Sequence, residues 1–163
     1  MKKLLEQYAA YNVWANQRIT DYLSNLSDEQ VNRELQSSFP SLFKTLLHLW
    51  DVEAVWWQRM KLQEIVQWPG ESFTGTILEL SQQLMLQSKQ WKEWVDLATE
   101  AALEHEFIYK NTKKDQFKQP VHEALHHLFN HQTYHRGQII TMLRQVGLIE
   151  IPNTDLIAFL RKK

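Results

Sequence analysis

Apolar side chains recur every three or four residues over most of the chain, the period that buries one face of an amphipathic helix. Four stretches with this period are long enough to form helices, and no proline interrupts them. Pro40 is well placed for the first turn of the second helix, the fourth is expected to begin near Pro120, and Gly147 is suited to the end of the fourth. The expected helices cover residues 3–24, 41–67, 75–98 and 120–146.

Shorter elements are expected in the connections. Ser27 and Gln30 have the spacing of a capping box, which predicts a short helical turn after the first long helix. Residues 103–120 break the helical period, because they contain a run that favours extended structure followed by a polar turn. They predict a small irregular hairpin, and residues 155–160 predict a last short helix.

The length of 163 residues is that of one domain, and we expect residues 1–163 to form a single one. Four glycines and four prolines leave few tight turns, which favours long helices. Long amphipathic helices in a chain of this size pack most naturally as a bundle, in which facing side chains converge on the interior. The predicted fold is therefore an all-α four-helix bundle, with a small hairpin before the last long helix and a short C-terminal helix.

The charge balance offers no general attraction to nucleic acid, since eighteen Lys and Arg residues stand against nineteen Asp and Glu residues. The start of the chain lacks the apolar core of a secretion signal, and no apolar run approaches membrane-spanning length. We therefore expect a cytoplasmic protein with neither a nucleic-acid nor a membrane partner. The chain has no cysteine, so any metal must be held by His, Asp or Glu.

Three histidines of the fourth expected helix are spaced four residues apart in HHLFNHQTYHRGQI. Positions four apart differ by about 40° around a helix, so His127, His131 and His135 share one face, whereas His122 and His126 point elsewhere. Relative to the apolar face, His135 is expected inside it, His131 at its border and His127 beyond it. A metal held there would lie near the edge of the bundle, where one coordination position can stay open to water or substrate.

A third ligand must come from another helix, because two histidines alone bind a divalent ion weakly. His48 is the best candidate, since it borders the apolar face of the second helix. The competing interpretation is that each histidine is an ordinary hydrogen-bonded residue beside the core, as most single histidines near an apolar face are. The repeated spacing of four favours the metal site over this interpretation.

Two carboxylates follow His48 in the second helix. Glu53 falls in the middle of the apolar face, where a buried carboxylate needs a partner. It could hydrogen-bond the second nitrogen of a ligand histidine, or act in catalysis as a proton carrier with a raised pKa. A purely structural bond to a Tyr, Trp or Arg side chain is an equal alternative. Asp51 is the competing carboxylate.

The sequence resembles the DinB family of damage-inducible bacterial proteins along essentially its whole length. The resemblance rests on YNVWANQRI, SLFKTLLHLWDVEAVWW, HLFNHQTYHRGQI and IPNTDLIAFLR, of which the NHxxxHRGQ core is the most specific. It implies a bundle with a long crossover connection, a homodimer, and a divalent metal held by three histidines. Carried over by motif, these are His48, His131 and His135, with His127 and Asp51 beside them as supporting or pocket-lining residues.

The resemblance also implies roles for two neighbours of His135. Gly137 is expected at a close packing contact, and Arg136 is expected to face outward. Related proteins include transferases that use bacillithiol, mycothiol or glutathione. The chain is thus expected to be a metal-dependent thiol S-transferase, or a hydrolase that activates water, with Zn or Ni as the ion. Its substrate would be a small thiol or electrophile, and any thiol must come from that substrate. The alternative is a noncatalytic, metal-stabilised stress-response or interaction protein.

Overall fold

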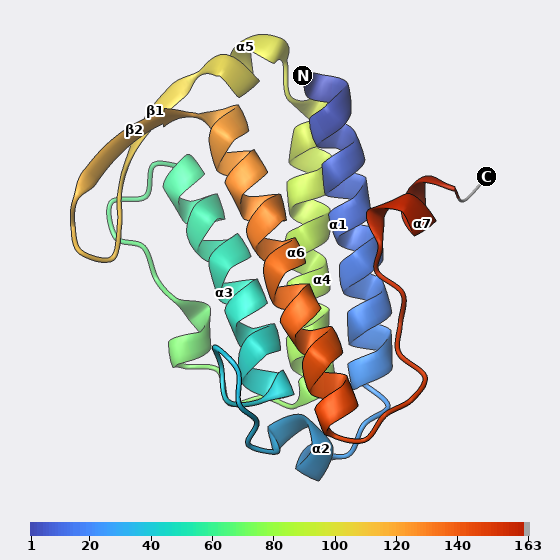
Figure 1. Ribbon diagram of the computed structural model, residues 1–163. Coiled ribbons are helices and arrows are strands. Elements are labelled where there is room, and N and C mark those ends of the chain that lie inside the picture. The colour runs from blue at the N-terminus through green and yellow to red at the C-terminus, as the bar shows by residue number, and fades with distance from the viewer. Residues whose placement is uncertain (162–163) are drawn as a thin grey trace.

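A computed structural model describes residues 1–161 of the chain, and four long helices account for most of them (Figure 1). The four helices lie side by side, and the predicted all-α class is confirmed. Each corresponds to one of the expected amphipathic stretches. Their bounds are Lys2–Leu23 for α1, Leu42–Met60 for α3, Ile77–Leu97 for α4 and Val121–Gln145 for α6.

The four helices run in two directions. The colours of Figure 1 show that α1 and α6 run one way along the molecule, whereas α3 and α4 run the other way. Helix α1 packs against α4 and α6, and α3 packs against the same two helices. Helices α3 and α4 are parallel, so the chain must return along the length of the molecule after α3 before it can begin α4. Residues 61–76 make this return and form the expected long crossover connection. This connection includes the short helix η1, Pro69–Glu71.

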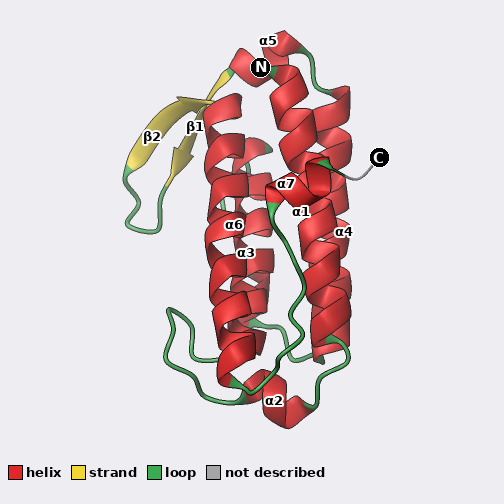
Figure 2. Cartoon of the chain, turned by 45° about the vertical axis from the view of Figure 1, so that its right-hand side comes forward, coloured by secondary structure: helices red, strands yellow, loops and turns green. Residues whose placement is uncertain are grey.

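Short elements close the two ends of the molecule. Figure 2 shows α2 at one end, and α5 with the β1–β2 hairpin at the other. The hairpin is antiparallel and pairs Ile108 with Lys118, as expected for this region, whereas α5 was not expected. Helix α7 lies against α1. The bounds of these short elements are Asp28–Asn32 for α2, Glu100–Glu104 for α5, Glu106–Lys110 for β1, Gln116–Pro120 for β2 and Leu156–Leu160 for α7.

Side-chain caps determine where α2 and α3 begin. The predicted capping box of Ser27 and Gln30 is confirmed, with both reciprocal hydrogen bonds present. The hydroxyl of Ser41 accepts a hydrogen bond from the backbone N–H of Lys44, so Ser41 is the N-cap of α3. Pro40 therefore precedes the cap and does not lie in the first turn of the helix, as its sequence position suggested.

Helix α3 ends at Met60, whereas its apolar period predicted an end near Gln67. Leu62 has a φ of 55°, a left-handed conformation that cannot continue the helix. The side-chain amide of Gln58 hydrogen-bonds both the backbone N–H and the backbone carbonyl of Gln67, each at 2.8 Å. These bonds fold the crossover connection back onto the last turn of α3.

The buried side chains form two apolar clusters with a polar layer between them along the bundle. One cluster includes Leu5, Trp91 and Phe129, and the other includes Ile19, Leu46 and Leu143. Between them, each long helix contributes buried polar residues that belong to neither cluster. The most important for the site are Asn12 and Asn16 of α1, Glu53 of α3, Ser88 of α4, and Gln132, His135 and Arg136 of α6.

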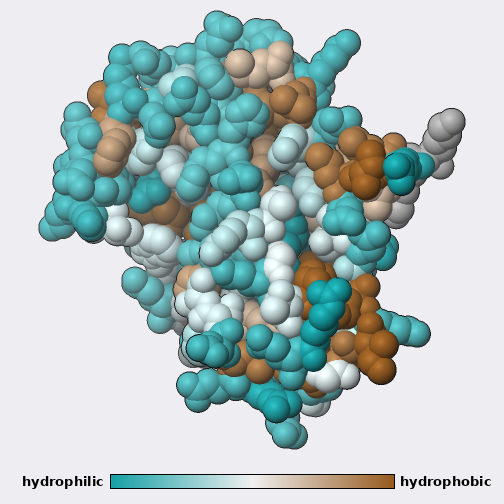
Figure 3. Space-filling model, in the orientation of Figure 1, coloured by the Kyte–Doolittle hydropathy of each residue, from teal (hydrophilic) through white to brown (hydrophobic). Residues whose placement is uncertain are grey.

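Hydrophilic residues cover most of the face shown in Figure 3, and apolar colour gathers along the side where the C-terminal segment runs. Ile149, Ile157 and Leu160 of that segment are exposed. Within the described residues, none of the helices combines the length and the apolar character needed to span a bilayer.

Candidate metal centre

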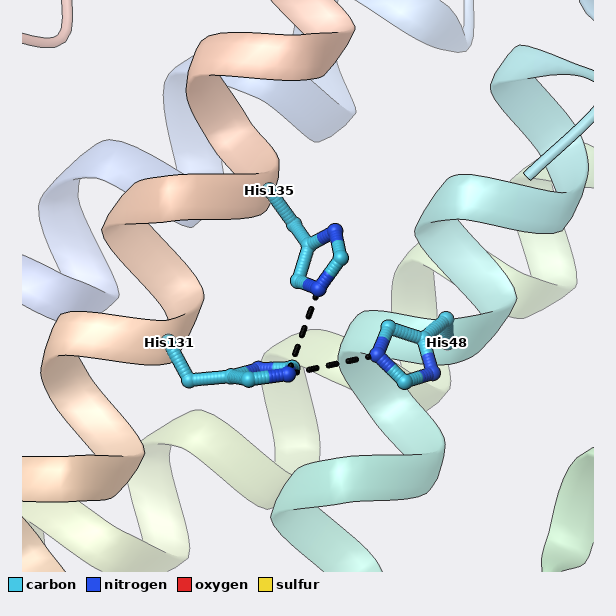
Figure 4. Close-up of side chains that lie close together, drawn as sticks. All are labelled: His48, His131 and His135. Atoms are coloured by element: carbon cyan, nitrogen blue, oxygen red, sulfur yellow. Dashed lines mark hydrogen bonds between the residues drawn. The ribbon is translucent and has the colours of Figure 1, made fainter. Parts of the chain in front are cut away.

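Three histidines from α3 and α6 converge where these two helices pack together. Figure 4 shows His48 of α3 facing His131 and His135 of α6. The Nε2 atom of His131 lies 3.4 Å from that of His48 and 3.2 Å from that of His135. One ring nitrogen of each residue lies within 4.8 Å of the other two. The structure therefore brings together the three residues that the sequence singled out as metal ligands.

These separations match the edge of a coordination tetrahedron. A bond from zinc to imidazole nitrogen is about 2.0–2.1 Å long, so two such ligands of a tetrahedral ion lie about 3.3–3.4 Å apart. The two measured Nε2–Nε2 separations are 3.4 and 3.2 Å. His131 therefore lies at the spacing of a shared small cation from both His48 and His135, and the ring nitrogens of all three lie within 4.8 Å of one another.

The burial of the histidines follows the order that the helical wheel predicted. His135 is buried, His131 is half-buried and His127 is exposed. His122 points elsewhere, because its Nδ1 lies 3.1 Å from the backbone oxygen of Leu103. The fixed rotation per residue of a helix is sufficient to explain this agreement.

Burial and crowding keep the three imidazoles neutral. Burial, with His135 as a smaller cause, lowers the pKa of His48 to about 4. Burial, with the neighbouring histidines as smaller causes, lowers the pKa of His131 to about 3. Burial also lowers the pKa of His135, against the effect of its hydrogen bond with Gln138. Near neutral pH the rings therefore retain lone pairs that a cation can use.

Gln138 fixes the ring of His135 from its outer side. The Nδ1 atom of His135 lies 2.8 Å from Oε1 of Gln138, a carbonyl oxygen that only accepts, so Nδ1 carries the proton and Nε2 keeps its lone pair. The Gln138 amide in turn donates a 2.8 Å hydrogen bond to the hydroxyl of Ser38. The cluster is thereby linked to the connection between α2 and α3.

Phe39, in that same connection, covers one side of the cluster. Its ring stacks on that of His48, with the centroids 4.2 Å apart, and lies 5.7 Å from the ring of His135. No sequence period pointed to this residue, because no helical period extends through the connection. The only local signal was an aromatic residue directly before Pro40.

The other two residues expected beside the ligands differ in their surroundings. The ring of His127 lies 5.7 Å from that of His131 and 5.2 Å from that of Trp56, outside the convergent set. Asp51 accepts a 2.6 Å hydrogen bond from the backbone N–H of Gly70, so it fastens the crossover connection to α3. Among the described residues, no hydrogen bond joins Asp51 to the three histidines.

Glu53 lies in the buried polar layer. Its carboxylate accepts hydrogen bonds from the amides of Asn12 and Asn16, at 2.8 and 3.3 Å, and from the hydroxyl of Ser88 at 2.9 Å. Burial raises the pKa of Glu53 to about 7, although these bonds and the charge of Arg136 lower it. The expected need for a partner is met by amides and a hydroxyl, and its role as a proton carrier stays a prediction.

Arg136 is buried, with only 1% of its surface exposed, whereas it was expected to face outward. Its Nη1 donates hydrogen bonds to the amide oxygens of Asn12 and Asn16, at 2.7 and 2.9 Å. The same two amides donate to Glu53, so they bridge a buried cation and a buried carboxyl. A helical wheel could not detect this arrangement, because the partners of Arg136 lie on another helix.

Comparison with known proteins decides the family. The sequence model of the DinB family matches residues 1–163. The chain belongs to the DinB family. Protein DinB of Bacillus subtilis (strain 168) is 34% identical in an alignment that covers 87% of this chain and 86% of that protein.

Solved structures of DinB-like proteins share the fold of this DinB-family chain. A DinB-like protein of Bacillus subtilis superimposes with a TM-score of 0.67 at 13% identity, covering 91% of this chain and 98% of that one. A DinB-like protein of Bacillus cereus gives a TM-score of 0.65 at 19% identity, covering 85% of this chain and 89% of that one.

Proposed function

We propose that this DinB-family protein binds one divalent metal ion through His48, His131 and His135, and that it is a metal-dependent thiol S-transferase. The observation that carries the proposal is the convergence of three ring nitrogens within 4.8 Å of one another, with the Nε2 atom of His131 at tetrahedral-ligand spacing from that of each of the other two histidines. Zinc and nickel suit a site made of imidazoles. The family resemblance supports a small-molecule thiol as substrate and a cytoplasmic homodimer as the working form.

The protonation of the cluster also favours a cation. The Nε2 atom of His135 has no hydrogen, because the proton of that ring is on Nδ1. The single Nε2 of His131 faces both other rings, at 3.4 and 3.2 Å, and it can carry at most one hydrogen. If that hydrogen is absent, two lone pairs meet between His131 and His135. If the hydrogen is present on Nε2 of His131, it can be donated to His48 or to His135 but not to both. A cation, in contrast, can accept a lone pair from all three rings.

A divalent cation in this position would lower the pKa of a bound thiol or water, and so supply an anionic nucleophile at neutral pH. The residues of the chain provide the surroundings for that chemistry. Gln138 holds His135 in one tautomer, and Phe39 shields one face of His48. The thiol must belong to the substrate, since the chain contains no cysteine.

Elemental analysis of untagged protein tests the metal site. We expect about one ion per wild-type chain, and less than a tenth of that in His48→Ala, because two histidines of one helix bind weakly. His122→Ala is the matched control, since this histidine of α6 points away from the cluster. Equal metal content in wild type and His48→Ala would remove the basis of the proposal.

A thiol-transfer assay tests the activity. Metal-loaded protein is incubated with bacillithiol or glutathione and a small electrophile, and the rate is compared with that of His131→Ala. We expect wild type to be at least a hundredfold faster, since the variant lacks the ligand that faces both other rings. Equal rates would leave the metal site in place and end the assignment as a transferase.

The alternative is a noncatalytic protein that the metal stabilises. The observation in its favour is that a cation here would join α3 to α6 beneath the ring of Phe39. The visible spectrum of cobalt-substituted protein distinguishes the two functions. A small thiol that enters the coordination sphere changes the spectrum of an enzyme-type site, whereas a closed structural site gives the same spectrum with and without it.

A further inference from the structure

Arg59, in the last turn of α3, carries a positive charge without an ionic partner in the described part of the chain. Its Nε–H is buried and has no hydrogen-bond acceptor. Its guanidinium lies instead over the rings of Trp56 and Tyr109, at 4.9 and 5.3 Å from their centroids. The Nε–H is therefore out of reach of a ligand, and Arg59 can receive an acceptor only through its two Nη groups.

This side chain lines a cavity of about 320 Å³ between the end of α3, the start of the crossover connection and the β1–β2 hairpin. Glu64 and Lys110 are the other charged residues that line it, so the cavity carries one net positive charge. None of the ion pairs among the described residues neutralises Arg59. The walls also include apolar and amide side chains, among them Leu62, Val66, Ile108 and Gln116.

A row of ring contacts connects Arg59 with the candidate metal centre. The ring of Trp56, over which Arg59 lies, is 5.2 Å from the ring of His127. The ring of His127 is in turn 5.7 Å from that of His131, one helical turn further along α6. Two side chains therefore separate the guanidinium from a candidate ligand, a span that a molecule the size of a short peptide can bridge.

We propose that Arg59 binds a carboxylate, and that this carboxylate is the far end of the thiol substrate whose sulfur reaches the histidine cluster. The second half of this inference rests on the proposed function. The two Nη groups of a guanidinium form a planar fork that matches the two oxygens of a carboxylate. The single net charge of the cavity also fits a monoanionic group better than a phosphate dianion.

Titration of metal-free protein with butyrate, a monocarboxylate, and separately with inorganic phosphate, tests the site independently of any activity. Binding is followed by tryptophan fluorescence. Arg59→Met keeps a long side chain over Trp56 but removes the charge, and Arg59→Lys keeps the charge but removes the fork. Arg18→Met is the matched control, since Arg18 lies over Trp14 in a similar contact at 5.3 Å.

We expect butyrate to bind wild type and Arg18→Met alike, and to bind both Arg59 variants at least about tenfold more weakly. Equal affinity in wild type and the Arg59 variants would overturn the site. Stronger binding of phosphate than of butyrate would overturn the choice of a carboxylate. If Arg59→Met loses its cooperative thermal transition, Arg59→Lys decides the result.

Kinetics test the link to the histidine cluster. Glutathione carries carboxylates and cysteamine carries none, so Arg59→Met should raise the KM for glutathione about tenfold, with kcat and the KM for cysteamine nearly unchanged. A parallel rise for both thiols would overturn the link. His131→Ala should still bind butyrate as wild type does. If wild type transfers no thiol, the link fails with the proposed function, whereas the carboxylate site stands or falls on its titration.

Discussion

The side-chain amide of Gln132 donates a 2.8 Å hydrogen bond to the backbone oxygen of Leu49, across the interface between α6 and α3. Gln132 directly follows His131, and Leu49 directly follows His48. The bond is buried and therefore fixes the relative position of the two helices beside two of the three candidate ligands. The geometry of the cluster thus depends on a contact that does not itself touch the metal.

Substitution of Gln132 by Leu should weaken metal binding without removing a ligand. We expect the dissociation constant for zinc to rise about tenfold, because residues that orient ligands commonly contribute 10–100-fold to affinity. The free energy of unfolding of the metal-free protein should fall by about 1 kcal/mol. Competition with a chromophoric chelator measures the affinity, and Gln145→Leu at the exposed end of α6 is the control. An unchanged zinc affinity in Gln132→Leu would contradict the role of this bond.

Substitution of Gln138 by Leu removes the acceptor that holds the Nδ1 proton of His135. The ring can then rotate or change tautomer, so zinc affinity should fall by about 10–100-fold. Ser38→Ala removes only the next contact outward, and its effect should be several times smaller. The same chelator competition measures both variants, and a loss in Ser38→Ala as large as that in Gln138→Leu would argue against the assignment.

The helical period was sufficient to predict the order of the histidines around α6. Each residue turns the helix by a fixed angle, so the spacing alone placed His135 inside the apolar face, His131 at its border and His127 outside it. His48 could be chosen because it borders the apolar face of its own helix. The meeting of His48 with His131 is a tertiary contact, and it was predicted only as the best partner in an expected bundle.

What could not be predicted depends on contacts between segments that are distant in sequence. Phe39 lies in a connection without a period, and its position on His48 follows from how that connection folds. Arg136 looked like a surface residue because its two asparagine partners lie on α1. The predicted end of α3 was also wrong. The apolar pattern continues past Met60, but hydrogen bonds from the side chain of Gln58 fold the following connection back onto the helix.

The stability of the metal-free protein should fall in acid because of the histidine cluster. Burial lowers the folded-state pKa of His48 from 6.5 to about 4 and that of His131 to about 3. Between these values and pH 6.5 the unfolded chain binds more protons, so the free energy of unfolding decreases as the pH falls below 6.5. His131→Phe should flatten this dependence in urea unfolding at pH 4.5, 5.5 and 7. Identical slopes in both proteins would contradict the lowered pKa values.

Glu53 should have the opposite pH dependence. Its pKa is raised from 4.5 to about 7 by burial, so the folded state binds the extra proton, and its contribution to stability falls as the pH rises from 4.5 to 7. Gln has nearly the same shape as a protonated Glu, so Glu53→Gln should match wild type near pH 4.5 and exceed it by up to about 3 kcal/mol above pH 7. Denaturant unfolding near pH 4.5 and above pH 7 measures the difference, and Glu104→Gln, at an exposed position, is the control at both pH values. A variant less stable than wild type above pH 7 would mean that the folded state favours the ionised carboxylate of Glu53, with Arg136 near it, and would contradict the raised pKa.

Two glycines, one in the C-terminal half of α6 and one just after its end, should respond to alanine in opposite directions. Gly137 was expected at a close packing contact, but no atom lies within 4 Å of the position that its Cβ would take. It is exposed within the helix, so Gly137→Ala should raise the free energy of unfolding by about 0.5–1 kcal/mol through its higher helix propensity.

Gly147 follows the end of α6 with a φ of 91°, a conformation that a side chain disfavours. Gly147→Ala should therefore lower the free energy of unfolding by about 1 kcal/mol, although its Cβ would also meet no atom within 4 Å. Since neither substitution creates a clash, the difference between the two variants in urea unfolding isolates the backbone effect. A loss of stability in Gly137→Ala would show that another surface packs against this face of α6, as an interface between two copies of the chain would.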